Sequence, residues 1–213
     1  MYKKNYHNKF IVVEGIEGAG KNHACSFIKK ILENYGIKKI ISIREPGSTP
    51  LAEKIRTLIK DKNIKEKIIN KTELLLLYAA RIQLVETIIK PKLKTGTWII
   101  SNRHDMSSFA YQGGGSRINT SFILKLRKMC LNNFYPDLTV YLDVEPKVGL
   151  KRAFSRGSTD RIEQKHLNFF IRTRNRYLQL INKNPKSIFI NANYNIKTVE
   201  QNIFKKIKIW LNK

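Results

Sequence analysis

The residues best suited to chemistry begin with a glycine-rich run near the start of the chain. Gly15-Ile16-Glu17-Gly18-Ala19-Gly20-Lys21-Asn22 follows a short apolar segment and has the spacing G-x-x-x-x-G-K of a P-loop. The glycines let the backbone turn its N–H groups toward phosphate oxygens, and the start of the following helix adds a favourable dipole. We therefore expect this run to bind nucleotide phosphates, with Lys21 bridging the terminal ones; a chance glycine-rich turn is the weaker alternative.

The residue after Lys21 departs from the usual motif. A Ser or Thr hydroxyl normally stands there and binds Mg²⁺, whereas this chain has Asn22. An amide oxygen is also a hard ligand, so Asn22 is the candidate metal ligand, although its side chain is longer.

Polar residues also follow the second and third apolar segments. Arg44 and Glu45 end the second segment and predict either a salt bridge within a turn or a pair that faces a substrate. After the third segment, Ser108, Tyr111 and Gln112 precede a triple glycine at 113–115. We expect a flexible binding loop there, because a plain exposed loop accounts poorly for Tyr111 and Gln112.

Arginines stand out at two further places. Arg81 interrupts an apolar stripe of a predicted long helix, so it either pairs with a carboxylate or points into a ligand pocket. Arg152, Arg156 and Arg161 surround a small polar segment. They form a solvated face or close over a transferring phosphoryl group.

Short apolar segments alternate with helical patterns along the whole chain. We predict strands at 10–13, 40–43, 98–101, 138–142 and 187–190, and helices at 21–35, 51–59, 72–89, 118–131, 148–156, 163–181 and 196–211. Pro91 is expected to end the long helix. The alternation predicts an α/β fold with a parallel five-stranded sheet covered on both faces, and 213 residues suit one domain. Ligands in such folds bind beyond the carboxyl ends of the strands.

The chain is strongly basic, with 41 Lys and Arg against 16 Asp and Glu and a net charge of +25. This predicts attraction to phosphates, nucleic acid or anionic lipid, but the bias toward Lys, Ile and Asn also fits AT-rich codon usage. The basic residues are spread evenly, so specific nucleic-acid binding is not expected. Two cysteines, Cys25 and Cys130, predict no disulfide framework. No signal peptide or membrane span is seen, so we expect a soluble cytoplasmic protein.

Several segments together resemble the thymidylate kinase (dTMP kinase) family over essentially the whole chain. They lie at 13–21, 44–47, 78–81, 103–105, 110–113, 136–143 and 160–163. Basic residues near 151–162, with no arginine inside the P-loop, are similar to the bacterial form that keeps its catalytic arginines in a lid. The resemblance implies a P-loop nucleoside-monophosphate-kinase fold with a small lid at about 151–162. It also implies a cytoplasmic homodimer that transfers the γ-phosphoryl of ATP to dTMP with Mg²⁺, giving dTDP and ADP in dTTP synthesis.

The resemblance also implies roles for individual residues. The catalytic set would be Lys21, Arg103, Arg152, Arg156 and Arg161. Substrate would be bound by Glu17, Arg44, Glu45, Arg56, Leu77, Arg81, Arg103, Ser108, Tyr111 and Gln112. Within that set, Glu17 would hold the sugar 3′-hydroxyl, Arg81 would hydrogen-bond the thymine, and Tyr111 would lie against the deoxyribose.

Three positions depart from the family's pattern. Asn22 replaces a metal-binding hydroxyl, Asn102 replaces an Asp, and Leu77 replaces an aromatic residue that stacks on thymine. These departures leave open a catalytically weakened or inactive nucleotide-binding homologue. A basic nucleic-acid-binding ATPase is a further alternative that only the charge favours. The remaining carboxylates Glu14, Asp105 and Asp143 are candidates for water-mediated metal binding.

Overall fold

The computed structural model describes residues 8–155, 157 and 159–212. Five parallel strands form one sheet in the order β2-β3-β1-β4-β5. Their bounds are β1 (Phe10–Glu14), β2 (Ile40–Arg44), β3 (Trp98–Asn102), β4 (Leu138–Asp143) and β5 (Ser187–Asn191). All five lie where the sequence predicts them, and the α/β fold class is confirmed.

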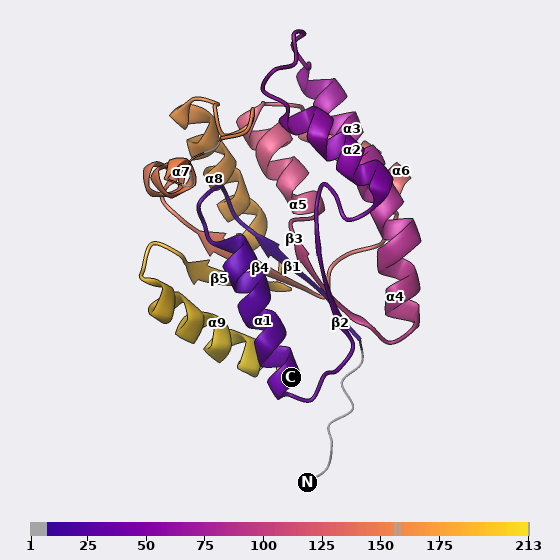
Figure 1. Cartoon of the computed structure of the whole chain (residues 1–213), viewed down its shortest axis with the longest axis vertical. Helices are drawn as coiled ribbons and strands as arrows, with labels where there is room; N and C mark the ends of the chain where they lie inside the picture. Colours follow the sequence, from indigo (N-terminus) through magenta and orange to yellow (C-terminus); the bar gives the residue numbers. More distant parts are fainter. Residues whose placement is uncertain (1–7, 156, 158, 213) are drawn as a thin grey trace.

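Helices cover both faces of this sheet (Figure 1). Ile11 and Val13 of β1 pack into a core formed with α1 (Lys21–Asn34), α8 (Leu167–Asn182) and α9 (Ile196–Leu211). The alternate residues Phe10 and Val12 pack into a second core formed with α3 (Asn70–Leu84), the π-helix η1 (Val85–Ile89) and α6 (Thr120–Leu131). Because β1 is buried on both faces, it is apolar at successive positions. Its carboxyl end is therefore held rigidly at the centre of the sheet.

Shorter helices complete the fold, with α4 leading into the amino end of β3 and the others near the carboxyl edge of the sheet. They are α2 (Pro50–Lys60), α4 (Lys90–Lys94), α5 (Asp105–Ser108), the π-helix η2 (Phe109–Gly115) and α7 (Pro146–Phe154). The helix predicted from residue 163 begins at Leu167, and the one predicted from residue 118 begins at Thr120, where the Asn119 side chain accepts a hydrogen bond from the Ser121 N–H. Within the described chain, no helix is both long enough and apolar enough to span a bilayer.

The prediction that Pro91 ends the long helix is wrong. The chain continues through η1 into α4, and Pro91 is the second residue of α4. Proline lacks an N–H, which costs little in the first turn of a helical segment. The change from α- to π-helical hydrogen bonding at Val85–Ile89 places Pro91 at such a position.

The prediction of a flexible loop at 107–115 is also wrong. The segment is helical through α5 and η2, and η2 packs closely against α8. A Cβ atom on Gly115 would lie 2.4 Å from the Phe169 ring and 2.6 Å from the Thr173 hydroxyl. This glycine therefore permits close helix packing rather than mobility, and η2 is a firm support for the side chains it carries.

Candidate active site

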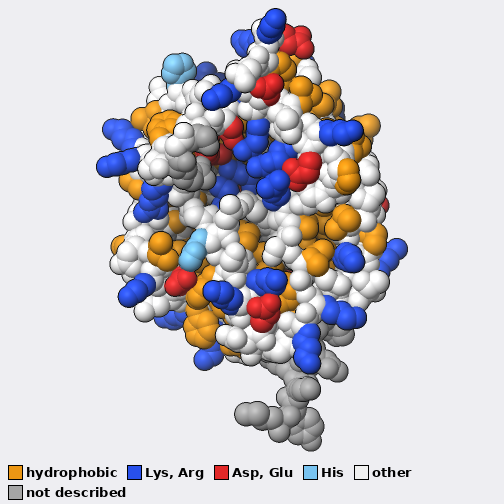
Figure 2. Space-filling view, viewed as in Figure 1, with side chains coloured by type: hydrophobic (Ala, Val, Ile, Leu, Met, Phe, Trp, Pro, Cys, Tyr) orange, Lys and Arg blue, Asp and Glu red, His pale blue; other side chains and the backbone are white. Residues whose placement is uncertain are grey.

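A cavity of about 510 Å³ opens at the carboxyl edge of the sheet. Its walls come from the P-loop, the ends of β2 and β3, helices α2 and α3, the α5–η2 segment and residues 160–163. Among the described lining residues, seven are Lys or Arg and five are Asp or Glu. Figure 2 shows basic side chains gathered in the central hollow of this face. The cavity therefore favours an anionic ligand.

The P-loop forms one end of this cavity. Glu17, Gly18, Gly20, Lys21 and Asn22 line it, whereas the predicted ATP-binding residues Gly15, Ile16 and Ala19 are buried in the turn beneath. The Lys21 ammonium donates a hydrogen bond to the Ile16 carbonyl at 2.7 Å, so it lies across the loop. Gly18 has a φ of +71°, and a Cβ there would lie 1.9 Å from the Gly149 carbonyl oxygen. The loop is thus shaped by its contact with α7.

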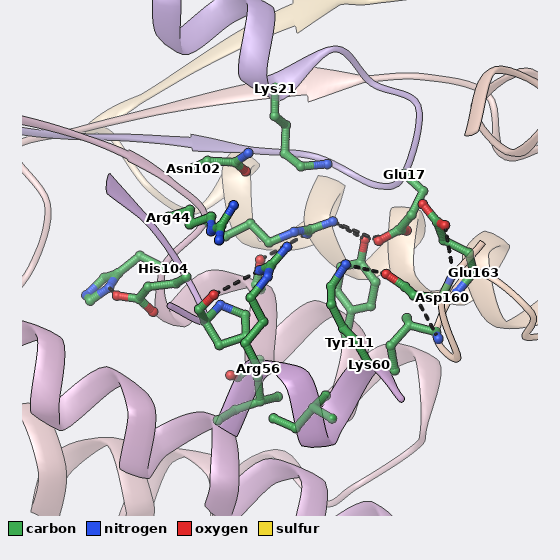
Figure 3. Close-up of a pocket in the computed structure, with 18 of the residues that line it drawn as sticks. Glu17, Lys21, Arg44, Arg56, Lys60, Asn102, His104, Tyr111, Asp160 and Glu163 are labelled. Carbon is green, nitrogen blue, oxygen red and sulfur yellow. Dashed lines mark hydrogen bonds and ion pairs between the residues drawn. The ribbon is translucent and has the colours of Figure 1, made fainter. Parts of the chain in front are cut away.

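The two asparagines that depart from the family's pattern contact each other. The Asn102 Nδ2 donates a hydrogen bond to the Asn22 Oδ1 at 2.5 Å. Figure 3 shows Asn102 beside Lys21. The Asn22 oxygen predicted to bind metal is therefore already engaged. Within the described part of the chain, no three His, Cys, Asp or Glu side chains gather into a metal site. This donor set does not fit a protein-held Mg²⁺, because that ion prefers carboxylate oxygens.

The three carboxylates considered for water-mediated metal binding lie outside the cavity lining. Glu14 accepts hydrogen bonds from the His104 N–H, the Ser107 hydroxyl and the Tyr177 hydroxyl. Asp105 pairs with Arg127 at 2.6 Å, and Asp143 pairs with Arg174 at 2.8 Å. All three are thus paired with protein groups in this structure, and their water-mediated metal binding stays a prediction.

Arg103 stands at the centre of a hydrogen-bonded cluster in the cavity. Its guanidinium donates to the Glu17 carboxylate at 2.9 Å and to the Tyr111 hydroxyl at 2.8 Å, and Tyr111 itself donates to Glu17 at 2.7 Å. Burial alone would lower the pKa of Arg103, but the neighbouring Tyr111 and Glu17 raise it well above its usual value. Arg103 is therefore a permanent cation. The structure brings together these three predicted site residues from the P-loop, the residue after β3 and η2.

Arg81 is paired with a carboxylate, as one alternative predicts, and it also lines the cavity. Its Nε donates to Glu45 at 2.7 Å, and its terminal nitrogens donate to the Ser108 hydroxyl and the His104 carbonyl. Glu45 also accepts from the His104 Nδ1 at 2.6 Å. Burial raises the pKa of Glu45, but the nearby His104 and Arg81 outweigh it and hold that pKa below its usual value.

Arg44 and Glu45 do not form a salt bridge with each other. Arg44 pairs with Glu53 of α2 at 3.0 Å, whereas Glu45 turns inward to Arg81. Arg56 donates to the Pro46 carbonyl at 2.8 Å, and burial together with the charge of Arg44 lowers its pKa. Figure 3 shows Arg44, Arg56 and Lys60 directed into the same space. Cations that crowd one another in this way suit a phosphate group between them.

The predicted lid arginines have different environments. Arg152 lines the cavity and donates to the Ala192 carbonyl at 2.8 Å, just after β5. Arg161 donates to the Ile59 carbonyl at 2.8 Å and forms an ion pair with Glu73. Arg156 lies outside the described residues. The neighbouring Asp160 pairs with Lys60 of α2, which ties this segment to the far wall of the cavity.

Sequence reasoning missed several residues that line this cavity, among them the ionisable side chains of Lys60, Glu73, His104 and Asp160. One of them carried a usable signal. Glu73, Leu77 and Arg81 are spaced by four residues, so they share one face of α3, and all three line the cavity. The other three depend on contacts between distant segments, which spacing does not reveal.

Comparisons with known proteins agree on one family. The thymidylate kinase family model matches residues 13–203. The chain is 57% identical over 206 residues to the thymidylate kinase of Buchnera aphidicola subsp. Acyrthosiphon pisum (strain APS), covering 97% of each protein. It is 49% identical to that of Vibrio parahaemolyticus serotype O3:K6 (strain RIMD 2210633), over 96% of this chain and 97% of that protein.

A solved structure is similar over nearly the same extent. The crystal structure of thymidylate kinase from Ehrlichia chaffeensis superimposes with a TM-score of 0.76 at 29% sequence identity, over 96% of this chain and 100% of that one. The P-loop, the buried Arg81 and the Arg103 cluster thus occur in a chain whose whole length matches this family. The chain belongs to the thymidylate kinase family.

Proposed function

We propose that this chain carries out its family's reaction, the transfer of the γ-phosphoryl group of ATP to dTMP. The observation that carries the proposal is the single cavity with two unlike ends. The P-loop and Lys21 form a phosphate-binding end, whereas Leu77, Arg81 and Gln112 form an end suited to a base. A phosphate oxygen of dTMP attacks the γ-phosphorus in the space between, and the bond from that phosphorus to the β-phosphate oxygen breaks. The products are dTDP and ADP.

The roles of the acceptor-site residues follow from their contacts. Arg44, Arg56 and Arg103 hold the dTMP phosphate, because they present permanent positive charge to one space. Glu17 binds the sugar 3′-hydroxyl as an acceptor, while Tyr111 packs against the deoxyribose. Glu45 holds Arg81, whose remaining N–H groups reach the base together with Ser108 and Gln112.

The donor-site roles rest on the P-loop and the segment around residues 151–162. The backbone from Gly15 to Asn22 binds the ATP phosphates, and Lys21 swings from the Ile16 carbonyl onto them. Arg152, Arg156 and Arg161 stabilise the negative charge that spreads over the transferring group. We treat residues 1–213 as one kinase domain in which 151–162 is the lid.

Mg²⁺ is part of the proposal only as a companion of ATP. The Asn22–Asn102 amide pair offers no carboxylate, so the phosphate oxygens and water hold the ion rather than this chain. Phosphoryl transfer depends mainly on positioning and electrostatics. The amide pair therefore affects how much Mg²⁺ is needed more than which reaction occurs.

The first test is ADP formation from ATP plus dTMP across a Mg²⁺ titration, with Asn22→Thr and Asn102→Asp as comparators. We expect the unaltered chain to turn over and to need roughly tenfold more Mg²⁺ than the double variant for half its maximal rate, because restored oxygens add direct metal binding. If the unaltered chain forms no ADP while the double variant does, the unaltered chain is instead an inactive nucleotide-binding homologue. Silence of both would reject the function.

We also infer that the protein works as a cytoplasmic homodimer. Leu75 of α3 and the α6 residues Phe122, Leu124 and Met129 are exposed apolar side chains, with Met129 82% exposed. Helices α3 and α6 are neighbours, and Lys71 lies 5.9 Å from the Phe122 ring between them. An apolar surface of this kind suits a second copy of the chain.

A further inference from the structure

Glu73 is a buried carboxylate that touches two different parts of the active site. It lies on α3, is 1% exposed and lines the cavity. Its Oε1 accepts a hydrogen bond from the Gln112 Nε2 at 2.8 Å, and its Oε2 pairs with the Arg161 guanidinium. Glu73 thus connects a residue at the base end of the cavity to a residue of the lid.

The contact with Glu73 determines which way round the Gln112 amide lies. A carboxylate only accepts hydrogen bonds, so Gln112 must present its NH₂ group to Glu73. Gln112 is 4% exposed and lines the same cavity. Among the described residues, no donor contacts the Gln112 Oε1. The carbonyl oxygen is therefore the group that remains for a ligand.

Next to the Gln112 carbonyl oxygen, Arg81 supplies hydrogen-bond donors. Its Nε–H is used by Glu45, and one N–H of each terminal nitrogen is used by the Ser108 hydroxyl or the His104 carbonyl. A guanidinium carries five N–H groups, so two remain. The base end of the cavity thus offers a ligand donors from Arg81 and an acceptor from Gln112.

This pattern complements one kind of pyrimidine. Thymine and uracil present a 4-oxo acceptor beside an N3–H donor, whereas cytosine presents a 4-amino donor beside an unprotonated N3 acceptor. Cytosine would place its 4-amino donor against the Arg81 donors and its N3 acceptor against the Gln112 carbonyl oxygen. A buried polar group left unpaired gives strong discrimination, much stronger than an added or missing methyl group.

We propose that Glu73 is a positioning residue for base specificity: by orienting the Gln112 amide, it makes the site select 4-oxo, N3–H pyrimidine nucleotides and reject 4-amino ones. The proposal deepens the proposed function and rests on it. Glu73 acts through Gln112 and does not itself contact the base.

The decisive variant is Glu73→Gln, which keeps the size of the side chain and removes one acceptor. Arg161 requires an acceptor, so the new amide turns its oxygen to Arg161 and its NH₂ to Gln112. Gln112 then flips to accept that hydrogen bond and turns its own NH₂ into the cavity. We expect the ratio of dissociation constants for dCMP and dTMP, measured by calorimetry without ATP, to fall by at least about tenfold.

Three controls separate this effect from a general disturbance. The Arg161→Met variant keeps the Glu73–Gln112 contact, so it should keep the dCMP-to-dTMP ratio. In the double variant E73Q/R161M, the new amide is free to turn its oxygen to Gln112, so the ratio should recover. The dUMP-to-dTMP ratio should be the same in all variants, because these two bases differ only by a methyl group.

Each outcome decides the proposal. An unchanged dCMP-to-dTMP ratio in folded E73Q, as judged by thermal melting, overturns it, as does failure of the double variant to recover. If E73Q does not fold, Gln112→Met replaces it as the test. The dCMP-to-dTMP ratio should then fall sharply. An unchanged ratio would show that Gln112 does not discriminate between the bases, and it overturns the proposal. Failure of the unaltered chain to bind dTMP would reject the proposed function instead.

Discussion

At the scale of single residues, buried charges in this protein are each held by a named partner. Glu45 and Asp105 lie in the interior, and each contacts an arginine at 2.7 Å or less. Burial raises the pKa of Asp105, but His104 and Arg127 outweigh it and lower that pKa below its usual value. His104 and Arg81 have the same effect on the pKa of Glu45. Glu14 behaves in the opposite way, because burial dominates and raises its pKa.

These shifts predict how stability depends on pH. A carboxyl whose pKa is lowered by folding stabilises the protein fully above its unfolded pKa and loses that contribution as the pH falls through its folded pKa. The ordinary values are 4.5 for Glu45 and 3.8 for Asp105. We expect the free energy of unfolding in urea to be nearly level from pH 7 to pH 5 and to fall steadily below about pH 4.5.

The matched control is Glu45→Gln, which removes one of these titrations. It should be less stable than the unaltered chain at pH 7, yet lose less of its stability between pH 5 and pH 3. The raised pKa of Glu14 has the opposite sign, but it acts only above the ordinary value of 4.5 and does not offset the fall below that pH. A level curve down to pH 3 would contradict the assignment of Glu45 and Asp105.

At the scale of elements, the P-loop depends on its close contact with helix α7. Gly18 packs on Gly149 of α7, and a Cβ there would overlap backbone atoms that cannot move aside. Gly20 also has a positive φ, of +87°, but no atom lies within 4 Å of its built Cβ. A side chain at Gly18 would therefore meet both close packing and backbone strain, whereas one at Gly20 would meet backbone strain alone.

The pair of variants Gly18→Ala and Gly20→Ala tests this difference. Gly18→Ala should cost roughly 2–4 kcal/mol of stability, because it adds overlap to strain. Gly20→Ala should cost roughly 1 kcal/mol, the strain of a left-handed residue alone. Thermal or urea unfolding measures both, and ATP binding should weaken more in Gly18→Ala. Equal effects would show that contact with α7 does not shape the loop.

At the scale of the whole molecule, the +25 net charge and the apolar surface on α3 and α6 have different consequences. On the face that Figure 2 shows, basic side chains gather in the central hollow. Elsewhere the charge is spread over the surface and opposes association between copies. We therefore expect the proposed dimer to depend on buried apolar area rather than on charge.

Light scattering after size exclusion tests this directly. We expect the mass of two chains for the unaltered protein and of one chain for the double variant L75K/M129K, because two lysines in an apolar interface remain without partners. The control is Ile209→Lys, an apolar position on α9 that is about as exposed as Leu75 and lies across the sheet from α3 and α6. The Ile209→Lys variant should remain dimeric. The mass of one chain for the unaltered protein and for both variants would reject the proposed dimer.

The sequence by itself determined the strands, the P-loop and most of the helices, because each depends on neighbouring residues: apolar runs, glycine spacing and helical periodicity. It also indicated the cavity residues Arg81, Arg103, Tyr111 and Gln112 through the family's motifs. Local patterns wrongly predicted a flexible loop at residues 107–115. Glycine is typical of both flexible loops and close helix packing, and only the contact with α8 shows which of the two applies here.

Only the tertiary structure decided which charged groups pair. Arg44 separates from its neighbour Glu45 because Glu53 lies within reach on α2 and Arg81 lies within reach on α3. Likewise, Glu73 meets Gln112, which is 39 residues away in the chain, and Arg161, which is 88 residues away. Hydrogen bonds depend on a few tenths of an ångström between such distant segments, and no spacing in the sequence encodes that distance.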